Sequence, residues 1–362
     1  LRDHMGFSAV RWPGIWDRGA GHFPDGGYWY SEGKLSPTQS ACAENGGGSR
    51  NRAGPLHGVP CLPASACYDS SPEAVAWQFF RLAPHVRPHM KPAISQVCSL
   101  ESTFERDLED YAAGACRAVE VWLGKLERFL ETHRLEEACP LAARHEVVLP
   151  AASFQGGLLA SAGDARRQTW DHFARRLHYC RMLGIETLVV ACDVPRPIDR
   201  DMLERVRFSL AEAARQARAE GVRLALEPQA GSALGNNVAT VASLVAETGS
   251  PHLGVCLDVF HYYLGPSKPE DLRLLDAENL FHVQLSDLAG TPREFATDSD
   301  RILPGEGDFD LQPILQRLAD IGYSRYISIE LMNPQLWRVP PRQFGEVAIT
   351  ALRKLLGQAS MD

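Results

Sequence analysis

The chain has 362 residues, of which 45% are hydrophobic, a formal net charge of −8 and a sequence pI of about 5.9. This length is enough to build one large domain or two domains of medium size. The acidic balance argues against binding to nucleic acid or to an anionic membrane, and no stretch reaches the roughly 18 apolar residues of a membrane span.

The nine cysteines are scattered, odd in number and without a C-x-x-C pair, a usage typical of reduced proteins. No apolar leader-like run stands near residue 1. Together these features predict a cytoplasmic protein. Cys98, Cys192 and Cys256 lie in strand-like runs and are interpreted as small core residues.

Residues 1–89 differ from the rest in composition. They hold 12 of the 30 glycines and 9 of the 24 prolines, and neither helical nor strand periodicity persists in them. A long irregular segment inside a compact domain is unusual, so we expect 1–89 to be an irregular extension outside the fold. Met90 resembles a natural start, which suggests that 1–89 lies upstream of the original protein. The folded domain is expected over 90–362.

From residue 90 onward, strand-like and helix-like runs alternate. Strands are expected over 93–98, 118–123, 147–153, 186–192, 222–227, 253–258, 280–285 and 326–331. Helices are expected from 102 or 103 to 115, over 125–133 with a further piece to 144, and over 164–183, 200–219, 238–248, 269–275, 311–321 and 342–356.

Eight β-α units in about 270 residues predict an α/β protein with a (β/α)₈ TIM barrel. A doubly wound fold would need a glycine-rich turn after the first strand, and residues 98–102 contain no glycine. Active sites of such barrels lie at the carboxyl ends of the strands, which is where the most informative residues stand.

Acids end three of the last four strands: Glu227, Asp258 and Glu330. Gln284 takes a similar place in the seventh strand. Because side chains alternate along a strand, each acid shares a face with small residues, whereas the branched residues take the other face. Strands 5 to 8 are consecutive around a barrel, so these four side chains are expected to converge inside its mouth.

Carboxylates brought together in a partly dry place repel one another unless a cation compensates them. The sequence therefore predicts a divalent metal held by Glu227, Asp258, Gln284 and Glu330, with Gln284 turning its carbonyl inward. Oxygen ligands favour Mn²⁺ or Mg²⁺, with Co²⁺ also compatible, over Zn²⁺. The alternative is four ordinary strand-end groups held by arginine and backbone donors.

Two histidines accompany this set. His261 follows Asp258 by three residues, beyond the strand end, and is a candidate to contact substrate, carry a proton or support the metal. The alternative is a histidine in a surface loop. His282 lies one layer below Gln284, as a substrate-binding residue or a satisfied interior histidine.

Further substrate-binding candidates lie in the loops. Arg301 and Glu306 belong to the tight segment 300–308 after strand 7, and Asp287 opens that loop. At the end of strand 2, Glu120 is assigned to a hydroxyl, Trp122 to a sugar face and Lys125 to an anionic group, with core and solvated positions as the alternatives. Weaker candidates are Ser153, Phe154, Gln155, Asp193 and Trp337.

Residues 90–362 resemble the sugar phosphate isomerase/epimerase group of the xylose isomerase-like (AP endonuclease 2-like) TIM barrel superfamily. The motifs that carry the resemblance are Leu226-Glu227-Pro228, Asp258-Val-Phe-His261, His282-Val-Gln-Leu-Ser-Asp287, Arg301-Ile-Leu-Pro-Gly-Glu-Gly307 and Ser328-Ile-Glu330. The resemblance implies Mn²⁺ or Co²⁺ at the four predicted ligands. It also implies that the two metal-bound glutamates move the proton.

Two departures bear on the substrate. Gln284 stands where the ketose 3-epimerases have histidine, and Ser232 stands where they have a further glutamate. A glutamine at that place resembles the dehydroshikimate dehydratase branch. Endonuclease IV, the DNA-repair relative, needs additional histidine ligands that the ends of strands 2 and 3 lack.

The sequence therefore predicts a metal-dependent isomerase or epimerase of a small polyhydroxylated carbonyl compound, phosphorylated or not. Glu330 and Glu227 would serve as base and acid, with His261 assisting, and Arg301 would steady substrate oxygens. A dehydratase that expels a β-hydroxyl is the alternative, and a barrel that only senses a sugar is a third. No nucleic acid or membrane partner is expected, and a homo-oligomer stays open.

Overall fold

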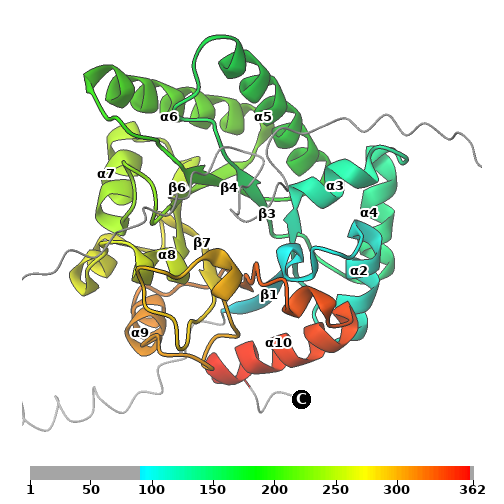
Figure 1. Cartoon of the computed structure of the whole chain (residues 1–362). Helices are drawn as coiled ribbons and strands as arrows, with labels where there is room; N and C mark the ends of the chain where they lie inside the picture. The colour runs from blue at the N-terminus through cyan, green and yellow to red at the C-terminus, as the bar shows by residue number, and fades with distance from the viewer. Residues whose placement is uncertain (1–89, 359–362) are drawn as a thin grey trace, which may run out of the picture. The chain divides into compact units, whose positions relative to one another are not determined.

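The computed structural model describes residues 90–358, which form a closed barrel of eight parallel strands with helices around it (Figure 1). Each strand pairs with the next along the chain, and β8 closes on β1. The predicted TIM barrel is thereby confirmed, whereas the predicted extension 1–89 lies outside the described residues. The strands are β1 (Lys91–Ser95), β2 (Val119–Trp122), β3 (Ala151–Gln155), β4 (Thr187–Cys192), β5 (Arg223–Pro228), β6 (Leu253–Asp258), β7 (Leu280–Leu285) and β8 (Tyr326–Ile329).

Helices follow the strands and cover the outside of the barrel (Figure 1). The α-helices are α2 (Phe104–Ala113), α3 (Leu123–Phe129), α4 (Leu135–Arg144), α5 (Gly163–Leu183), α6 (Arg200–Glu220), α7 (Val238–Thr248), α8 (Val259–Leu264), α9 (Gln312–Asp320) and α10 (Pro341–Leu355). Four short 3₁₀ helices are η1 (Gln96–Ser99), η2 (Pro269–Leu274), η3 (Asp298–Asp300) and η4 (Leu336–Arg338).

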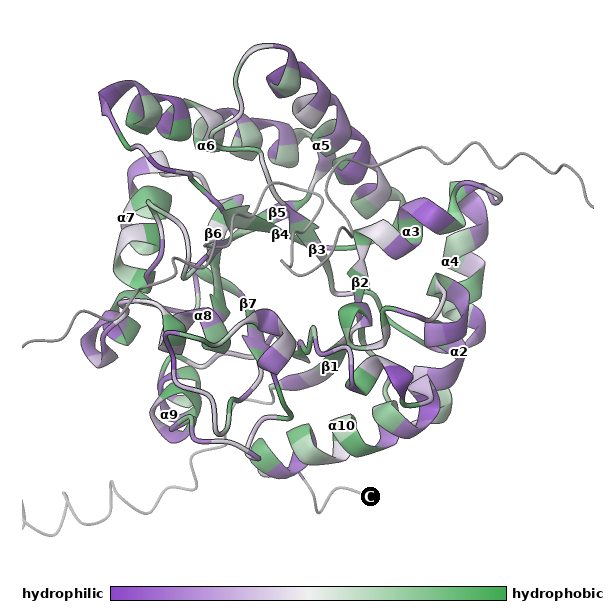
Figure 2. Cartoon of the chain, in the orientation of Figure 1, coloured by the Kyte–Doolittle hydropathy of each residue, from purple (hydrophilic) through white to green (hydrophobic). Residues whose placement is uncertain are grey.

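The strands are buried on both faces, as expected for a parallel sheet covered by helices. Figure 2 shows the hydrophobic residues concentrated on the strands and on the helix faces directed at them, with hydrophilic residues outward. The register places Asp258 beside Gln284, and Gln284 beside Ser328, so neighbouring strands bring their inward side chains to similar heights. This alignment is what allows residues from separate strands to meet.

Two predicted strands were wrong by several residues. The first was expected over 93–98 but is β1, because the chain turns into η1 at Gln96. The Gln96 side chain donates to Phe104 O (3.2 Å) and accepts from Trp122 N (3.2 Å), which fixes this turn. Cys98 is therefore buried in η1 and not in a strand. The third strand was expected over 147–153 but is β3, which begins after Pro150.

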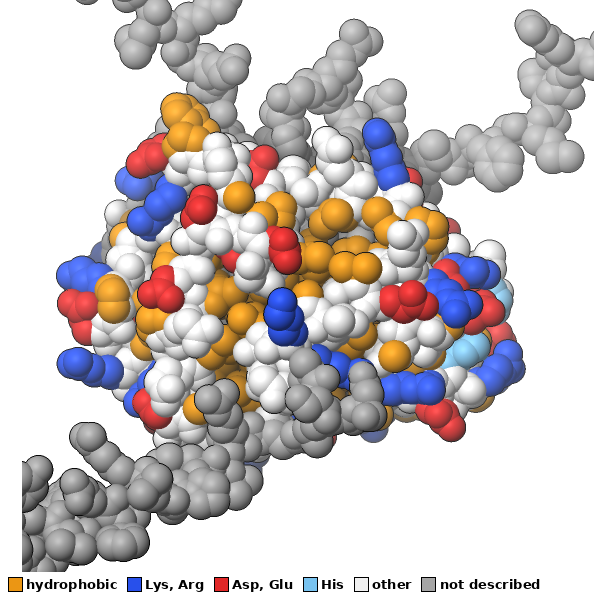
Figure 3. Space-filling model, turned by 90° about the horizontal axis from the view of Figure 1, so that it is seen from below, with side chains coloured by type: hydrophobic (Ala, Val, Ile, Leu, Met, Phe, Trp, Pro, Cys, Tyr) orange, Lys and Arg blue, Asp and Glu red, His pale blue; other side chains and the backbone are white. Residues whose placement is uncertain are grey.

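Charged residues of both signs are interspersed on the side of the barrel where α9 and α10 lie, around hydrophobic side chains near its centre (Figure 3). This face carries no field of a single sign, in agreement with the modest net charge of the chain. Among the described residues, no helix has the length and apolar character that crossing a membrane requires.

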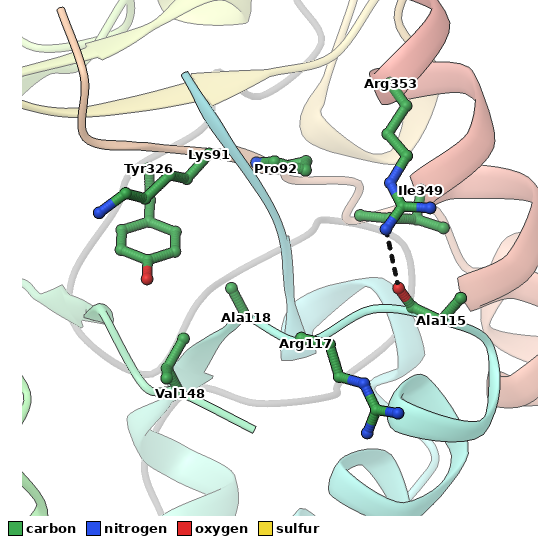
Figure 4. Close-up of a pocket in the computed structure, with 9 residues that line it drawn as sticks. All are labelled: Lys91, Pro92, Ala115, Arg117, Ala118, Val148, Tyr326, Ile349 and Arg353. Carbon is green, nitrogen blue, oxygen red and sulfur yellow. Dashed lines mark hydrogen bonds between the residues drawn. The ribbon is translucent and has the colours of Figure 1, made fainter. Parts of the chain in front are cut away.

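A hollow of about 220 Å³ opens at the amino-terminal ends of β1 and β8. Figure 4 shows its lining, with Arg353 beside Ile349 and bonded to Ala115 O. Lys91 lies over the Tyr326 ring, 5.1 Å from its centroid. Because catalytic groups of these barrels lie at the carboxyl ends of the strands, this hollow is at the opposite end from the candidate site.

A three-residue ionic cluster ties α3 to α5 near the end of β3. Glu127 accepts from His172 Nε2 (2.5 Å) and from Arg176 Nε and Nη2 (2.8 and 3.0 Å), and Arg176 also donates to Phe154 O (3.0 Å). Burial raises the pKa of Glu127, but the hydrogen bonds from His172 and Arg176 outweigh it and lower this pKa to about 2.

We expect Glu127→Gln to lower the free energy of unfolding at pH 7 by about 1–3 kcal/mol, because it leaves Arg176 without its charged partner. The folded pKa of about 2 lies below the ordinary value of 4.5, so Glu127 stabilises the fold above pH 4.5 and loses this effect as the pH falls toward 2. Urea unfolding should therefore show a smaller gap between variant and wild type at pH 3 than at pH 7. Glu131→Gln, at an exposed position, is the control; an equal gap at both pH values would contradict the prediction.

Candidate active site

Acidic and amide side chains meet at the carboxyl ends of β5 to β8. Glu227 and Asp258 lie at the carboxyl ends of β5 and β6, Gln284 lies near the end of β7, and Glu330 follows β8 directly. All four are buried, with exposed fractions of 1–5%. The backbone N–H of Glu330 donates to Leu285 O (3.1 Å), which extends the pairing of β7 and β8 to this residue. The structure thus brings together the four residues that the sequence predicted as ligands.

Arg301 enters this cluster from the loop after β7. Its Nη1 donates to Asp258 Oδ2 (2.7 Å) and to Glu330 Oε2 (3.3 Å), and its Nε and Nη2 donate to Asp298 Oδ1 (2.9 and 2.7 Å). The side chain is fully buried. The predicted inward position of Arg301 is therefore what the structure has, and its contacts are with carboxylates of the cluster itself.

Gln284 has the opposite orientation from the one predicted. Its amide Nε2 donates to Glu120 Oε1 and to Glu330 Oε1 (both 2.9 Å), and its carbonyl Oε1 accepts from Cys256 Sγ (3.1 Å). The two buried carboxylates are strong acceptors and take the amide N–H groups, so the carbonyl turns away from them and accepts from the weaker thiol donor. In this orientation Gln284 donates to the acids and does not direct its oxygen into the predicted metal site.

Glu120 and His282 form the floor beneath the cluster. His282 Nε2 lies 2.8 Å from Glu120 Oε2 and 3.3 Å from Ser328 Oγ, and all three residues are buried. Burial raises the pKa of Glu120, but the charge of His282 and its hydrogen bond outweigh burial and lower this pKa. Glu120 was predicted to bind substrate, and His282 either to bind substrate or to be a satisfied interior histidine; here they bond to each other, below the other acids.

His261 lies beyond the end of β6, as predicted, but on α8 and buried, so the alternative of a histidine in a surface loop is wrong. The helix starts at once because Asp258 caps it, with Oδ1 accepting from His261 N (3.1 Å). Burial lowers the pKa of His261, which favours the neutral ring. Its Nδ1 is buried and has no hydrogen-bond partner within residues 90–358. A ligand or metal in the site would give this nitrogen a partner.

The cluster carries more negative than positive charge. Burial, and next the charge of Asp258, raise the pKa of Glu227 well above its ordinary value. Burial also raises the pKa of Glu330 well above its ordinary value, although Arg301 opposes it. Burial acts in the same direction on Asp258, but Arg301 outweighs it and lowers the pKa of that carboxyl to about 2. Arg301 pairs with three of the buried carboxylates, Asp258, Asp298 and Glu330, and two more, Glu120 and Glu227, act on Glu330 from nearby.

A divalent cation fits this arrangement. Donor atoms of Glu227, Asp258 and His261 all lie within 4.8 Å of one another, and each of these residues is buried. A cation there would offset the repulsion that raises the pKa of Glu227, and it would give the free Nδ1 of His261 a partner. The site can therefore hold a divalent metal, and this donor set does not by itself select which one.

Several predicted substrate residues lie elsewhere. Lys125 is buried against Asp107 (2.5 Å) and Ser99 O (2.5 Å), and these contacts occupy the ammonium group. Asp287 is buried and accepts from the backbone N–H groups of Leu288, Gly305 and Phe309 (2.9–3.0 Å), so its carboxylate shapes the loop. These two assignments are corrected accordingly: both are structural.

Other candidates line or flank the mouth. Trp122 is partly buried, with its ring 5.3 Å from that of Phe154, and Glu306 is exposed on the loop after β7. Trp337 donates to Val97 O (2.8 Å), which ties η4 to η1. The remaining weaker candidates are bonded locally, Gln155 to Gly156 O (2.8 Å) and Asp193 to Gly157 N (2.6 Å), while Ser153 is buried beside them.

Sequence reasoning missed two residues of the site. Cys256 was assigned to the core, although it shares the face of Asp258 two residues on, and strand alternation could have placed its thiol toward the acids. Asp298 was not singled out. It stands three residues before Arg301 in a short 3₁₀ turn, a spacing that could have suggested an ion pair.

Comparison with known proteins agrees with this architecture. The model of the xylose isomerase-like TIM barrel family matches residues 109–355. An inosose isomerase of Bacillus velezensis is 27% identical over 261 residues, covering 69% of this chain and 91% of the relative. A 3-dehydroshikimate dehydratase of Pseudomonas putida is 27% identical over 274 residues, covering 74% of this chain and 41% of the relative.

Solved structures share the fold. The IOLI protein with a bound zinc atom superimposes with a TM-score of 0.68 at 24% identity, covering 75% of this chain and 99% of that one. D-psicose 3-epimerase from Clostridium cellulolyticum H10, with D-tagatose, gives a TM-score of 0.61 at 20% identity, covering 74% and 99%. At these identities the likeness establishes the barrel alone.

We expect the purified protein to bind one divalent ion per chain, and Asp258→Asn to weaken Mn²⁺ binding by about 100-fold, because the variant removes a charge from the donor set. The asparagine still caps α8, so the fold should be kept. Calorimetric titration with Mn²⁺, Mg²⁺, Co²⁺ and Zn²⁺ measures this. Glu306→Gln, which neutralises an exposed acid on the loop after β7, should bind as wild type does. Unchanged affinity in Asp258→Asn would rule out this donor set.

Proposed function

The chain belongs to the xylose isomerase-like TIM barrel family, and from this premise we propose that it is a divalent-metal-dependent isomerase or epimerase of a polyhydroxylated ketone. The observation that carries the proposal is the convergence of Glu227, Asp258 and Glu330, from three strands, in one buried place. The inosose isomerase that this chain matches along nine-tenths of the relative's length supports the substrate class.

Proton transfer next to a carbonyl needs a base, an acid and positive charge near the oxygen. A divalent ion, when bound by Glu227, Asp258 and neighbouring donors, supplies that charge by withdrawing electrons from the carbonyl. Glu330 takes the proton from the carbon beside the carbonyl, through a carboxylate oxygen. Glu227 returns a proton from its own strand, either to carbon on the opposite face or to the former carbonyl oxygen.

The other residues orient the reactants. Gln284 donates to Glu330 Oε1 and Arg301 to Glu330 Oε2, so both oxygens of the base are directed. His261, whose Nδ1 has no hydrogen-bond partner among the described residues, is placed with Glu227 and Asp258 to help hold the ion. The burial of these side chains keeps water from competing for the proton.

Dehydration is the second candidate function, and a specific residue favours it. Gln284 stands where the ketose 3-epimerases have histidine, as in the dehydratase branch that the sequence resembles, and a 3-dehydroshikimate dehydratase is among the matched relatives. The first step would be the same, removal of a proton beside a carbonyl. Loss of a β-hydroxyl would then replace return of the proton to carbon, with Glu227 as the group that protonates the departing oxygen.

Incubation in D₂O separates these reactions. With metal-loaded protein and a panel of inososes and ketohexoses, we expect one solvent deuterium at the carbon beside the carbonyl in recovered sugar, measured by NMR and mass spectrometry. Appearance of an aromatic chromophore from 3-dehydroshikimate, without deuterium in any ketose, would favour the dehydratase. Binding of these ketones with neither result would contradict both functions.

We expect Glu330→Gln and Glu227→Gln each to lower kcat by about 10³-fold, because each removes a group that carries a proton. Each change keeps the side-chain volume and removes one of several mutually repelling buried charges, so thermal unfolding should stay near that of wild type. Glu101→Gln, at an exposed acid after η1, is the matched control. If deuterium exchange persisted at the wild-type rate in Glu330→Gln, its role as the base would be refuted.

A further inference from the structure

The donors of the buried Arg301 are divided between two sets of acceptors. Nε and Nη2 both donate to Asp298 Oδ1, at 2.9 and 2.7 Å, whereas Nη1 donates to Asp258 Oδ2 and Glu330 Oε2, at 2.7 and 3.3 Å. One edge of the guanidinium is thus held by its own loop, and the other faces the proposed catalytic carboxylates.

Two further contacts restrict the same group. The guanidinium lies over the ring of Phe260, 4.4 Å from its centroid, and Asn333 Nδ2 donates to the backbone oxygen of Arg301 (3.0 Å). A planar cation with one edge, one face and its backbone fixed has a single orientation. Among the described residues that Arg301 contacts, Asp298 is the charged acceptor that comes from the loop of Arg301 itself, whereas Asp258 and Glu330 stand at strand ends.

Asp298 and Asp300 have separate tasks although they stand two residues apart. Asp300 Oδ2 accepts from Thr297 N and Oγ1 (2.8 and 2.9 Å) and closes the capping box of η3. Asp298 is 8% exposed, and its Oδ1 accepts two hydrogen bonds from Arg301. Asp300 therefore shapes the turn, and Asp298 acts on the cation that the turn presents.

We propose that Asp298 is a positioning residue: it holds the guanidinium of Arg301 so that Nη1 alone addresses Asp258 and Glu330. This inference rests on the proposed function, in which Glu330 is the base. Without Asp298, the Nε edge of a buried cation is left unpaired and turns toward the nearest carboxylates, which are Asp258 and Glu330. More N–H groups then occupy the oxygens that must accept the proton, so kcat falls more than substrate binding weakens.

Kinetics of three variants test this assignment. We expect Asp298→Ala to lower kcat by about 100-fold with a change in KM of less than about threefold, and Asp298→Asn to recover most of the loss because its Oδ1 still accepts both hydrogen bonds. Asp300→Ala, the matched loop control, should stay within about threefold of wild type. Equal losses in Asp298→Ala and Asp300→Ala, or no recovery in Asp298→Asn, would show that only the loop matters and overturn the proposal.

A binding experiment that needs no turnover separates this proposal from the proposed function. Arg301→Ala leaves space for methylguanidinium, whose binding is measured by calorimetry in Arg301→Ala, Arg301→Ala/Asp298→Ala and Arg301→Ala/Asp300→Ala. We expect affinity to drop by about tenfold or more only when Asp298 is absent. Equal affinity in all three would overturn the proposal, even in an active enzyme. If the wild type is inactive on every ketone, the binding series still decides the role of Asp298. If Arg301→Ala fails to fold, the comparison of kcat between Asp298→Asn and Asp298→Ala decides it.

Discussion

The carboxyl mouth of this barrel depends on placing several carboxylates out of water and close together. Five acids are buried there with Arg301. Burial acts to raise the pKa of Glu120, Glu227, Asp258 and Glu330, and positively charged neighbours reverse this effect only at Glu120 and Asp258. The closed sheet accepts this cost because its strands are held by helices on the outside and cannot splay apart to relieve repulsion. Positive charge must therefore come to the acids, from Arg301 and from a cation that the donor set can hold.

Neighbouring side chains direct hydrogen bonds to the acids. Cys256 occupies the carbonyl of Gln284, which directs the amide N–H groups to Glu120 and Glu330. His282 then compensates Glu120 from below. The donors of this hydrogen-bond network are buried and already paired with the acids, so the site is organised before a substrate enters. Electrostatic stabilisation is most effective under that condition.

Family membership and site chemistry answer different questions. The matched family and the shared fold account for the place of the acids, because the carboxyl ends of barrel strands are where such enzymes keep their chemistry. In the function proposed above, the glutamine in β7 bears instead on which reaction follows proton removal. The relatives that this chain matches include both an inosose isomerase and a 3-dehydroshikimate dehydratase.

Much of the fold and the identity of the acids followed from the sequence, since the alternation of runs and the period of two along each strand are local properties. Glu227, Asp258 and Glu330 could be placed on one inner face for that reason. The partner of each side chain was decided only by the tertiary structure. Lys125 faces Asp107, Asp287 binds its own loop, and Gln284 turns its carbonyl to Cys256, because hydrogen bonds between strands and loops distant in the chain depend on three-dimensional distances that no sequence spacing encodes.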